Sequence, residues 1–129
     1  MITSKIKASF QEEFGSITHL FTIIEEPLSS LAACTKTHVY NPGVYVFVLD
    51  NQVIKVGRHL TNSRKRALEH IRDNTSGKGV FQMKSLADKP ETKVILFNVS
   101  DPKNYHWVAA VEIYLENKLE PLIKSGRTG

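Results

Sequence analysis

Positive charge is concentrated in one short part of this sequence. Residues 55–78 hold seven cations against two carboxylates, whereas residues 1–50 hold three lysines against five acids. The whole chain has a formal net charge of +4. Such a cluster suits a partner that bears phosphate, such as a nucleic acid, although a solvated basic helix has the same composition. The seven cations are Lys55, Arg58, Arg64, Lys65, Arg66, Arg72 and Lys78.

Arg66 and His70 are spaced so that they can share a site. They are four residues apart, so a helix would place both on one face. The planar guanidinium of an arginine binds oxyanions in two places. A lone histidine at such a position is otherwise typical of a helix surface. The further candidates for contact with a nucleic-acid backbone, which would position a partner without reading its sequence, are Arg58, Arg64, Lys65 and Lys78.

Lys55 interrupts the strand-like segment VIKVG (53–57). An ammonium between apolar faces must reach solvent, find a partner or lose its proton. On an edge strand the lysine would deter aggregation. The functional interpretation concerns an effect of Lys55 on Tyr45. A free tyrosine has a pKa of about 10, so it is almost fully protonated at pH 7 unless a nearby cation favours its ionised form. A lysine cation about 4 Å away would supply about 4 kcal/mol toward ionisation, so Lys55 would make Tyr45 a general base or hold a water molecule itself.

The register of the hairpin decides between these interpretations. A three-residue loop, 50–52, places Phe47 opposite Lys55, and Lys55 then shares a face with Tyr45. A two-residue loop places Lys55 and Tyr45 on opposite faces, unless a bulge restores the register.

The spacing of apolar residues predicts the elements that hold these side chains. Ile2, Ile6 and Phe10 predict a first helix that ends at Gly15, whereas residues 16–26 fit either a strand or a helix. The segment VYVFVLD (44–50) is apolar on both faces and predicts a central strand covered on both sides. The later elements are a strand over 53–57, a helix over about 62–72 capped by Thr61 or Asn62, a strand over 92–100, and a helix from Asp101 and Pro102 to Pro121.

These elements predict an α+β fold with a small three-stranded, mainly antiparallel sheet flanked by helices. Residues 1–40 would form an N-terminal helical extension packed on a core of residues 41–129, all within one compact domain. No apolar run approaches the roughly 20 residues that span a bilayer, and the first residues lack a secretory pattern. The single cysteine, Cys34, excludes an intrachain disulfide. We therefore expect a cytoplasmic protein without a membrane segment.

Four motifs follow one another along residues 42–124. They are Gly43-Val44-Tyr45, Lys55-Val56-Gly57, the R-x-x-x-H pair of Arg66 and His70, and Glu112, nine residues before Pro121. Each triplet alone is weak evidence, but the combination resembles the GIY-YIG endonuclease family. The resemblance implies metal-dependent hydrolysis of phosphodiester bonds in DNA.

The resemblance also implies roles for single residues. Tyr45 would lie beside the scissile phosphate, Arg66 would contact phosphate, and His70 would orient the phosphate or the tyrosine. Glu112 would bind Mg²⁺ or Mn²⁺. Because Mg²⁺ prefers oxygen ligands and keeps several waters, one carboxylate together with the substrate phosphate is sufficient. Glu116, one helical turn later, is the competing ligand.

The sequence departs from the family pattern at two places. Lys55 replaces the tyrosine of the second triplet, which resembles some restriction-type members. Lys124 and Ser125 stand where the family has an asparagine. The alternative function is therefore a nucleic-acid-binding module that keeps the fold without catalysis. Sequence-specific cleavage would need base contacts from residues 1–40 or from a homodimer.

Overall fold

The computed structural model describes residues 1–73 and 82–124 of the chain. The elements are α1 (Ile2–Phe14), η1 (Gly15–Leu20), β1 (Phe21–Pro27), α2 (Leu28–Leu31), β2 (Gly43–Leu49), β3 (Gln52–His59), α3 (Ser63–Arg72), η2 (Met83–Asp88), β4 (Lys93–Val99), η3 (Pro102–Asn104) and α4 (His106–Leu119).

One four-stranded antiparallel sheet, in the order β1-β4-β2-β3, forms the middle of the molecule. The α+β class is thus confirmed. The expectation of three strands was wrong by one, because β1 arises from the segment whose pattern fitted either a strand or a helix. It pairs along its whole length with β4, from Phe21↔Val99 to Pro27↔Lys93. Residues 1–40 therefore supply a strand of the sheet as well as helices.

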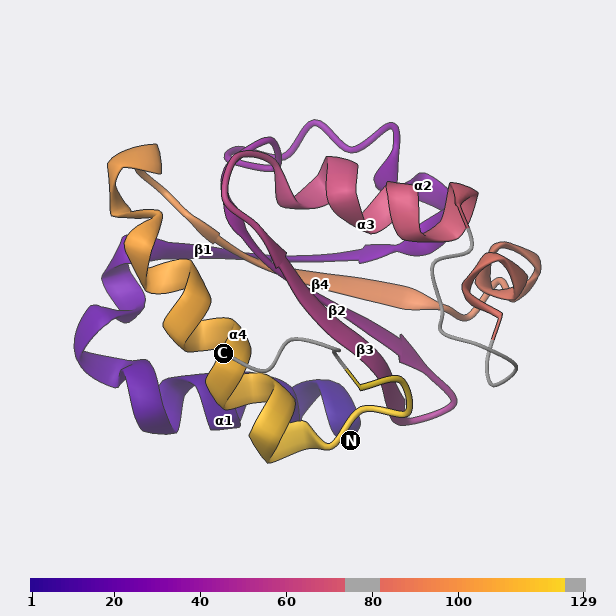
Figure 1. The fold of residues 1–129 in the computed structure, drawn as a ribbon, viewed down its shortest axis with the longest axis horizontal. Coiled ribbons are helices and arrows are strands. Elements are labelled where there is room, and N and C mark those ends of the chain that lie inside the picture. Colours follow the sequence, from indigo (N-terminus) through magenta and orange to yellow (C-terminus); the bar gives the residue numbers. More distant parts are fainter. Residues whose placement is uncertain (74–81, 125–129) are drawn as a thin grey trace.

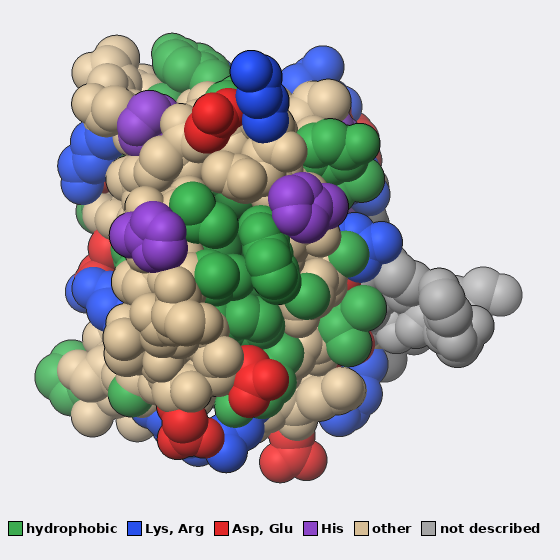
Figure 2. All heavy atoms as spheres, turned by 90° about the vertical axis from the view of Figure 1, so that its left-hand side faces the viewer, with side chains coloured by type: hydrophobic (Ala, Val, Ile, Leu, Met, Phe, Trp, Pro, Cys, Tyr) green, Lys and Arg blue, Asp and Glu red, His purple; other side chains and the backbone are tan. Residues whose placement is uncertain are grey.

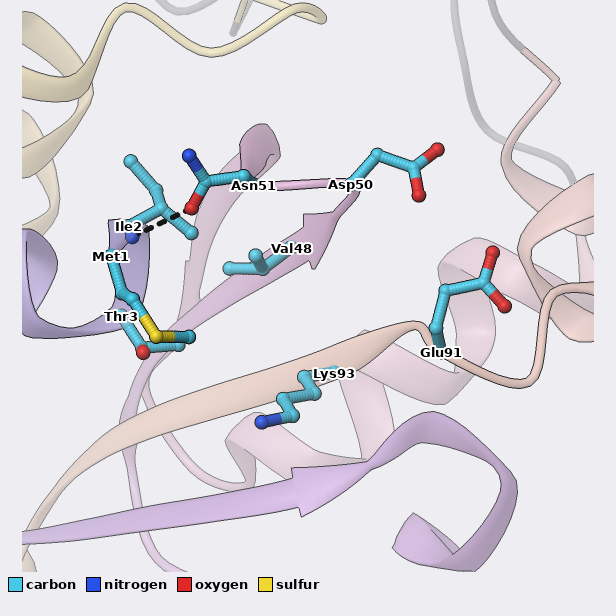
Figure 3. A pocket seen from close by; sticks show the side chains of 8 residues that line it. All are labelled: Met1, Ile2, Thr3, Val48, Asp50, Asn51, Glu91 and Lys93. Atoms are coloured by element: carbon cyan, nitrogen blue, oxygen red, sulfur yellow. Dashed lines mark hydrogen bonds between the residues drawn. The ribbon is translucent and has the colours of Figure 1, made fainter.

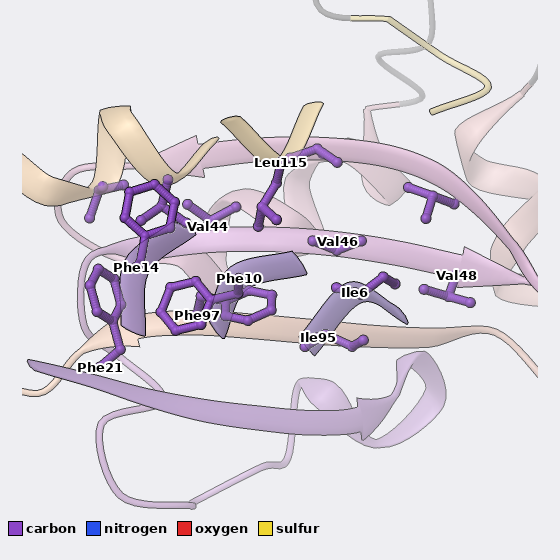
Figure 4. Packing of buried hydrophobic residues seen from close by; sticks show 14 of the residues in the cluster. Ile6, Phe10, Phe14, Phe21, Val44, Val46, Val48, Ile95, Phe97 and Leu115 are labelled. Atoms are coloured by element: carbon purple, nitrogen blue, oxygen red, sulfur yellow. The ribbon is translucent and has the colours of Figure 1, made fainter. Parts of the chain in front are cut away.

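Helices cover both faces of the sheet (Figure 1). α1 and α4 pack on the face that carries the side chains of Val44, Val46 and Val48, and Figure 4 shows Ile6, Phe10 and Leu115 lying over it. α2 and α3 pack on the face that carries Tyr45, Phe47 and Leu49. We call these the α1/α4 face and the α2/α3 face.

β2 is the central strand that the sequence predicts. All seven of its residues are buried, and it pairs with β3 on one side and β4 on the other. This burial follows from the sequence, since a strand with apolar side chains on both faces can bury all of them only when both faces of the sheet are covered. Within residues 1–73 and 82–124, β3 pairs with β2 and with no other strand, so it forms one edge of the sheet.

The hairpin between β2 and β3 combines a two-residue turn with a bulge. Asp50 and Asn51 both adopt positive φ, 53° and 60°, as a tight hairpin turn requires. Leu49 then pairs with Gln52 and Val48 with Val53, but Phe47 pairs with Lys55. Ile54 is the extra residue of a β-bulge, which shifts the register by one. Of the alternatives that the sequence left open, the structure therefore has the two-residue loop with a bulge that restores the register, and Lys55 shares the α2/α3 face with Phe47 and Tyr45.

α3 forms over the predicted range, and Asn62 rather than Thr61 caps it, because its side chain accepts a hydrogen bond from the Lys65 amide. α4 starts later than predicted. Asp101 caps the short 3₁₀ turn η3 instead, where its carboxylate accepts a hydrogen bond from the Lys103 amide. α4 ends with Glu120 in the left-handed conformation.

Gly57 makes room for Tyr45. The two residues are paired across β2 and β3, and a Cβ at position 57 would overlap the ring and the hydroxyl oxygen of Tyr45. The tyrosine ring therefore lies directly over the backbone of the edge strand. This close approach, rather than an unusual backbone angle, explains the glycine of the second triplet.

We predict that Gly57→Ala lowers the free energy of unfolding by about 1–3 kcal/mol, because the added methyl must displace a buried ring. Gly15→Ala is the matched control, since a Cβ there meets only the flexible end of Gln11 at 3.1 Å. The control should be neutral or stabilise by up to about 1 kcal/mol. Urea denaturation of both variants tests this. Equal stability of Gly57→Ala and wild type would contradict the packing of Tyr45 over Gly57.

Candidate functional site

Tyr45 and His70 form a buried polar contact between the central strand and α3. The Tyr45 hydroxyl oxygen lies 2.6 Å from His70 Nε2, and the ring centroids are 5.3 Å apart. Tyr45 is 2% exposed and His70 5% exposed. A contact this short in a buried site orients both rings. The sequence predicted that both residues belong to one site.

His70 is neutral at physiological pH. Burial lowers its pKa most, and the nearby cations Lys55 and Arg66 lower it further, to about 3. We therefore assign the hydrogen bond with the Tyr45 hydroxyl as donor and His70 Nε2 as acceptor, which requires the ring proton on Nδ1. The histidine is thereby placed to receive a proton from the tyrosine.

Lys55 lies on the Tyr45 side of the sheet, because the bulge at Ile54 places it opposite Phe47. It is two residues from Gly57, the partner of Tyr45, and such diagonal neighbours are within reach of long side chains. Its charge acts on His70. Lys55 and Tyr45 therefore share a face, as their cooperation requires. β3 is also an edge strand, so the position of Lys55 fits the interpretation that it deters aggregation as well.

Arg66 contributes to the same site at a longer range. Its Nη1 donates to Glu69 Oε1 at 3.2 Å, and its side chain is 36% exposed. The positive charge helps to lower the pKa of His70. Arg66 thus borders the Tyr45–His70 contact while keeping access to solvent.

Glu112 binds Arg58 on the other side of β3. Arg58 Nη1 donates to Glu112 Oε1 at 2.7 Å, and the Glu112 side chain is 1% exposed. Arg58 pairs with Val44 in the ladder, so its side chain belongs to the α1/α4 face. We expected Arg58 to contact a nucleic-acid backbone, and the sequence did not predict this ion pair with Glu112. The alternation of side chains along β3, with Gly57 toward Tyr45, was the available signal.

The two contacts border the same stretch of the edge strand. Tyr45 lies over Gly57 on the α2/α3 face, and the next residue, Arg58, holds Glu112 on the α1/α4 face. Among the residues that the structure describes, no further strand pairs with β3, and the amides of Leu122 and Ile123 donate to the carbonyls of Val53 and Ile54 near its start. The catalytic assignment of Tyr45, Lys55, Arg66, His70 and Glu112 stays a prediction.

The donor set fits a divalent cation only in part. Within residues 1–73 and 82–124, no group of three or more His, Cys, Asp or Glu side chains is arranged to hold a metal. Glu112 offers a buried carboxylate, and Mg²⁺ can be held by one carboxylate together with water and phosphate. This fits an ion shared with the substrate rather than one enclosed by protein. Glu116 stays the competing ligand.

Two of the remaining predicted cations, Arg64 and Lys65, lie on α3. Arg64 Nη1 donates to the Ala32 carbonyl at 2.8 Å, and Lys65 is exposed in the first turn. Lys78 lies outside the described residues. Figure 2 shows a different side of the molecule, on the left of Figure 1, where apolar side chains gather at the centre and histidines flank them.

A hollow of about 260 Å³ lies at the hairpin end of the sheet. Figure 3 shows Asn51 accepting a hydrogen bond from the Ile2 amide at 2.8 Å, with Asp50, Glu91 and Lys93 around the opening. None of its lining residues belongs to the predicted site. The hydrogen bond from the Ile2 amide to Asn51 joins α1 to the turn between β2 and β3.

No protein-family model, curated protein or solved structure matches this chain. Among the helices of the described residues, none has the length and apolar character needed to cross a membrane.

We predict that His70 makes stability depend on pH. Its pKa is about 3 when folded and about 6.5 when unfolded, so the unfolded chain binds the extra proton between these values. The stabilisation is complete above pH 6.5 and declines as pH falls toward 3. Between pH 7 and pH 5 it should decline by up to about 2 kcal/mol.

Urea denaturation of wild type and His70→Gln at pH 5 and pH 7 measures this effect. The variant should lose that part of the pH dependence, whereas His106→Gln, at an exposed histidine, should retain it. A His70→Gln variant with the wild-type pH dependence would contradict a buried, neutral His70.

Proposed function

We propose that this protein is a metal-dependent endonuclease of the GIY-YIG type that hydrolyses phosphodiester bonds in DNA inside the cell. The observation that carries the proposal is the Tyr45–His70 contact of 2.6 Å over Gly57, with Lys55 on the same face of the sheet. Three of the predicted site residues, from two strands and a helix far apart in sequence, thus lie on the same side of the sheet, and two of them are in direct contact.

In the proposed reaction Tyr45 acts as a proton relay. The attacking water gives a proton to the Tyr45 oxygen while the Tyr45 hydroxyl proton passes to His70 Nε2. Burial, and in addition the charges of Lys55 and Arg66, lower the pKa of His70 and make it a poor base in the absence of substrate. A phosphate bound beside these cations would offset their charge, so the basicity of His70 would rise when substrate is in place.

Glu112 and Arg58 form the other half of the proposed site. Mg²⁺, when bound, would stabilise charge on the phosphate and the leaving oxygen. Glu112 would hold the ion. Because Arg58 Nη1 lies 2.7 Å from Glu112 Oε1, Arg58 would have to release this carboxylate or share it with the ion. Once released, Arg58 is placed to contact the nucleic acid.

The Arg58–Glu112 ion pair also favours the second candidate, a DNA-binding module without catalysis. A carboxylate held by an arginine is already neutralised within the protein. If Arg58 keeps Glu112, the basic helix would still bind nucleic acid while the metal site would not form.

We predict that the purified protein nicks supercoiled plasmid in Mg²⁺ and that EDTA abolishes the activity. Tyr45→Phe should lower the rate by about 100-fold or more, because it removes the relay proton and keeps the ring. Tyr105→Phe, at an exposed tyrosine, should not change it. If the wild-type protein nicks plasmid no faster than Glu112→Ala, the endonuclease function is rejected and the DNA-binding module is the function that fits.

We predict that Arg58→Gln strengthens Mn²⁺ binding by about tenfold, measured by titration calorimetry without DNA. A charge-assisted hydrogen bond to the carboxylate is worth about 1.5–3 kcal/mol and competes with the metal. Glu112→Gln should abolish binding, whereas Glu116→Gln should leave it unchanged. Loss of binding in Glu116→Gln alone would assign the metal to that residue instead.

A further inference from the structure

The outer side of α3 carries a hollow of about 290 Å³. Among the residues that line it are three cations and one carboxylate, and that carboxylate, Glu69, already accepts a hydrogen bond from Arg66. The hollow is therefore positively charged, although Arg72 is paired with Asp73 at 2.8 Å. The lining residues are Asn62, Arg64, Lys65, Leu68, Glu69 and Arg72.

Tyr40 and Arg64 form a stacked pair beside this hollow. The Arg64 guanidinium carbon lies 4.5 Å from the centroid of the Tyr40 ring, and the hydrogen bond from Nη1 to the Ala32 carbonyl holds the guanidinium in place. Tyr40 is nevertheless 53% exposed. An apolar ring that stays half in solvent next to a fixed cation is a ready platform for another planar group.

We propose that Tyr40, Arg64 and Lys65 bind an unpaired stretch of nucleic acid. A base would stack on the Tyr40–Arg64 pair, and its phosphate would contact Lys65 at the hollow. Bases stack on aromatic rings and on guanidinium planes when they are released from a duplex. The inference rests on the proposed function in naming DNA as the substrate class and in placing the bound strand next to the cleaved bond.

The position of this surface relative to the predicted site supports a strand that flanks the cleaved bond. His70 and Ala67 lie on the buried side of α3, toward Tyr45, whereas Arg64 and Lys65 lie on the outer side. A helix is about 10 Å across with its side chains. A strand that leaves the Tyr45–His70 contact would need to cross only this distance. Paired bases could not reach the ring face, so a single strand fits better than a duplex.

Fluorescence anisotropy in EDTA tests the proposal without cleavage, using a labelled oligothymidine and a blunt duplex of the same length. Tyr40→Ala should weaken oligothymidine binding by about tenfold, because it removes the ring on which one base stacks, and it should not affect duplex binding. Tyr40→Phe, which keeps a ring, and Tyr105→Ala, at another exposed tyrosine, should both bind like wild type.

Lys65→Ala should lower the slope of log affinity against log salt by about 0.7 for oligothymidine, the value for one phosphate contact on a single strand. If Tyr40→Ala loses affinity equally for both probes, or for neither, the single-strand assignment is overturned. This outcome does not bear on the proposal of plasmid cleavage. If Tyr40→Ala loses affinity for oligothymidine alone and the wild-type protein does not nick plasmid, the single-strand surface is supported and the nuclease function is rejected. Failure of wild type to bind either probe would reject both proposals.

Discussion

The buried hydrogen bond between Tyr45 and His70 constrains most of the structure around it. It requires a residue without a side chain at Gly57, because the ring lies over that backbone. It requires a neutral imidazole, which burial and the neighbouring cations ensure by lowering the pKa of His70. It also fixes α3 over the central strand near the end of the helix. A single polar contact thereby links strand pairing, helix position and the protonation state of the proposed site.

The opposite end of α3 is held by a second buried polar contact. Ser63, the first residue of the helix, donates to Asn98 Oδ1 at 2.5 Å, and both side chains are fully buried. Asn98 also donates to the His38 carbonyl at 2.9 Å and lies so close to Gly43 that a Cβ there would overlap it. The glycines of both triplets thus accommodate side chains that position α3. Ala67 is buried between Ser63 and His70, and Leu68 and Ile71 pack partly buried against the same core, so polar and apolar contacts position this helix together.

The β-bulge at Ile54 explains how one strand serves two faces. The tight turn at Asp50 and Asn51 would by itself place Lys55 opposite to Tyr45. The extra residue restores Lys55 to the face of Tyr45 and leaves Arg58 on the face of α4. Cations therefore lie on both sides of the same edge strand, which is where a phosphate backbone would run in the proposed function.

The sequence by itself determined the α+β class, the central strand, the range of α3 and the pairing of Tyr45 with His70 in one site. The first three follow from local patterns, namely apolar residues on both faces of residues 44–50 and helical spacing after Asn62. The placement of Tyr45 and His70 in one site was implied by the family resemblance of their motifs. Tertiary structure decided what depends on distant contacts. β1 became a strand only because β4 offers it a partner. The bulge and the Arg58–Glu112 ion pair depend on how the hairpin twists against α4, and no pattern within one element encodes that geometry.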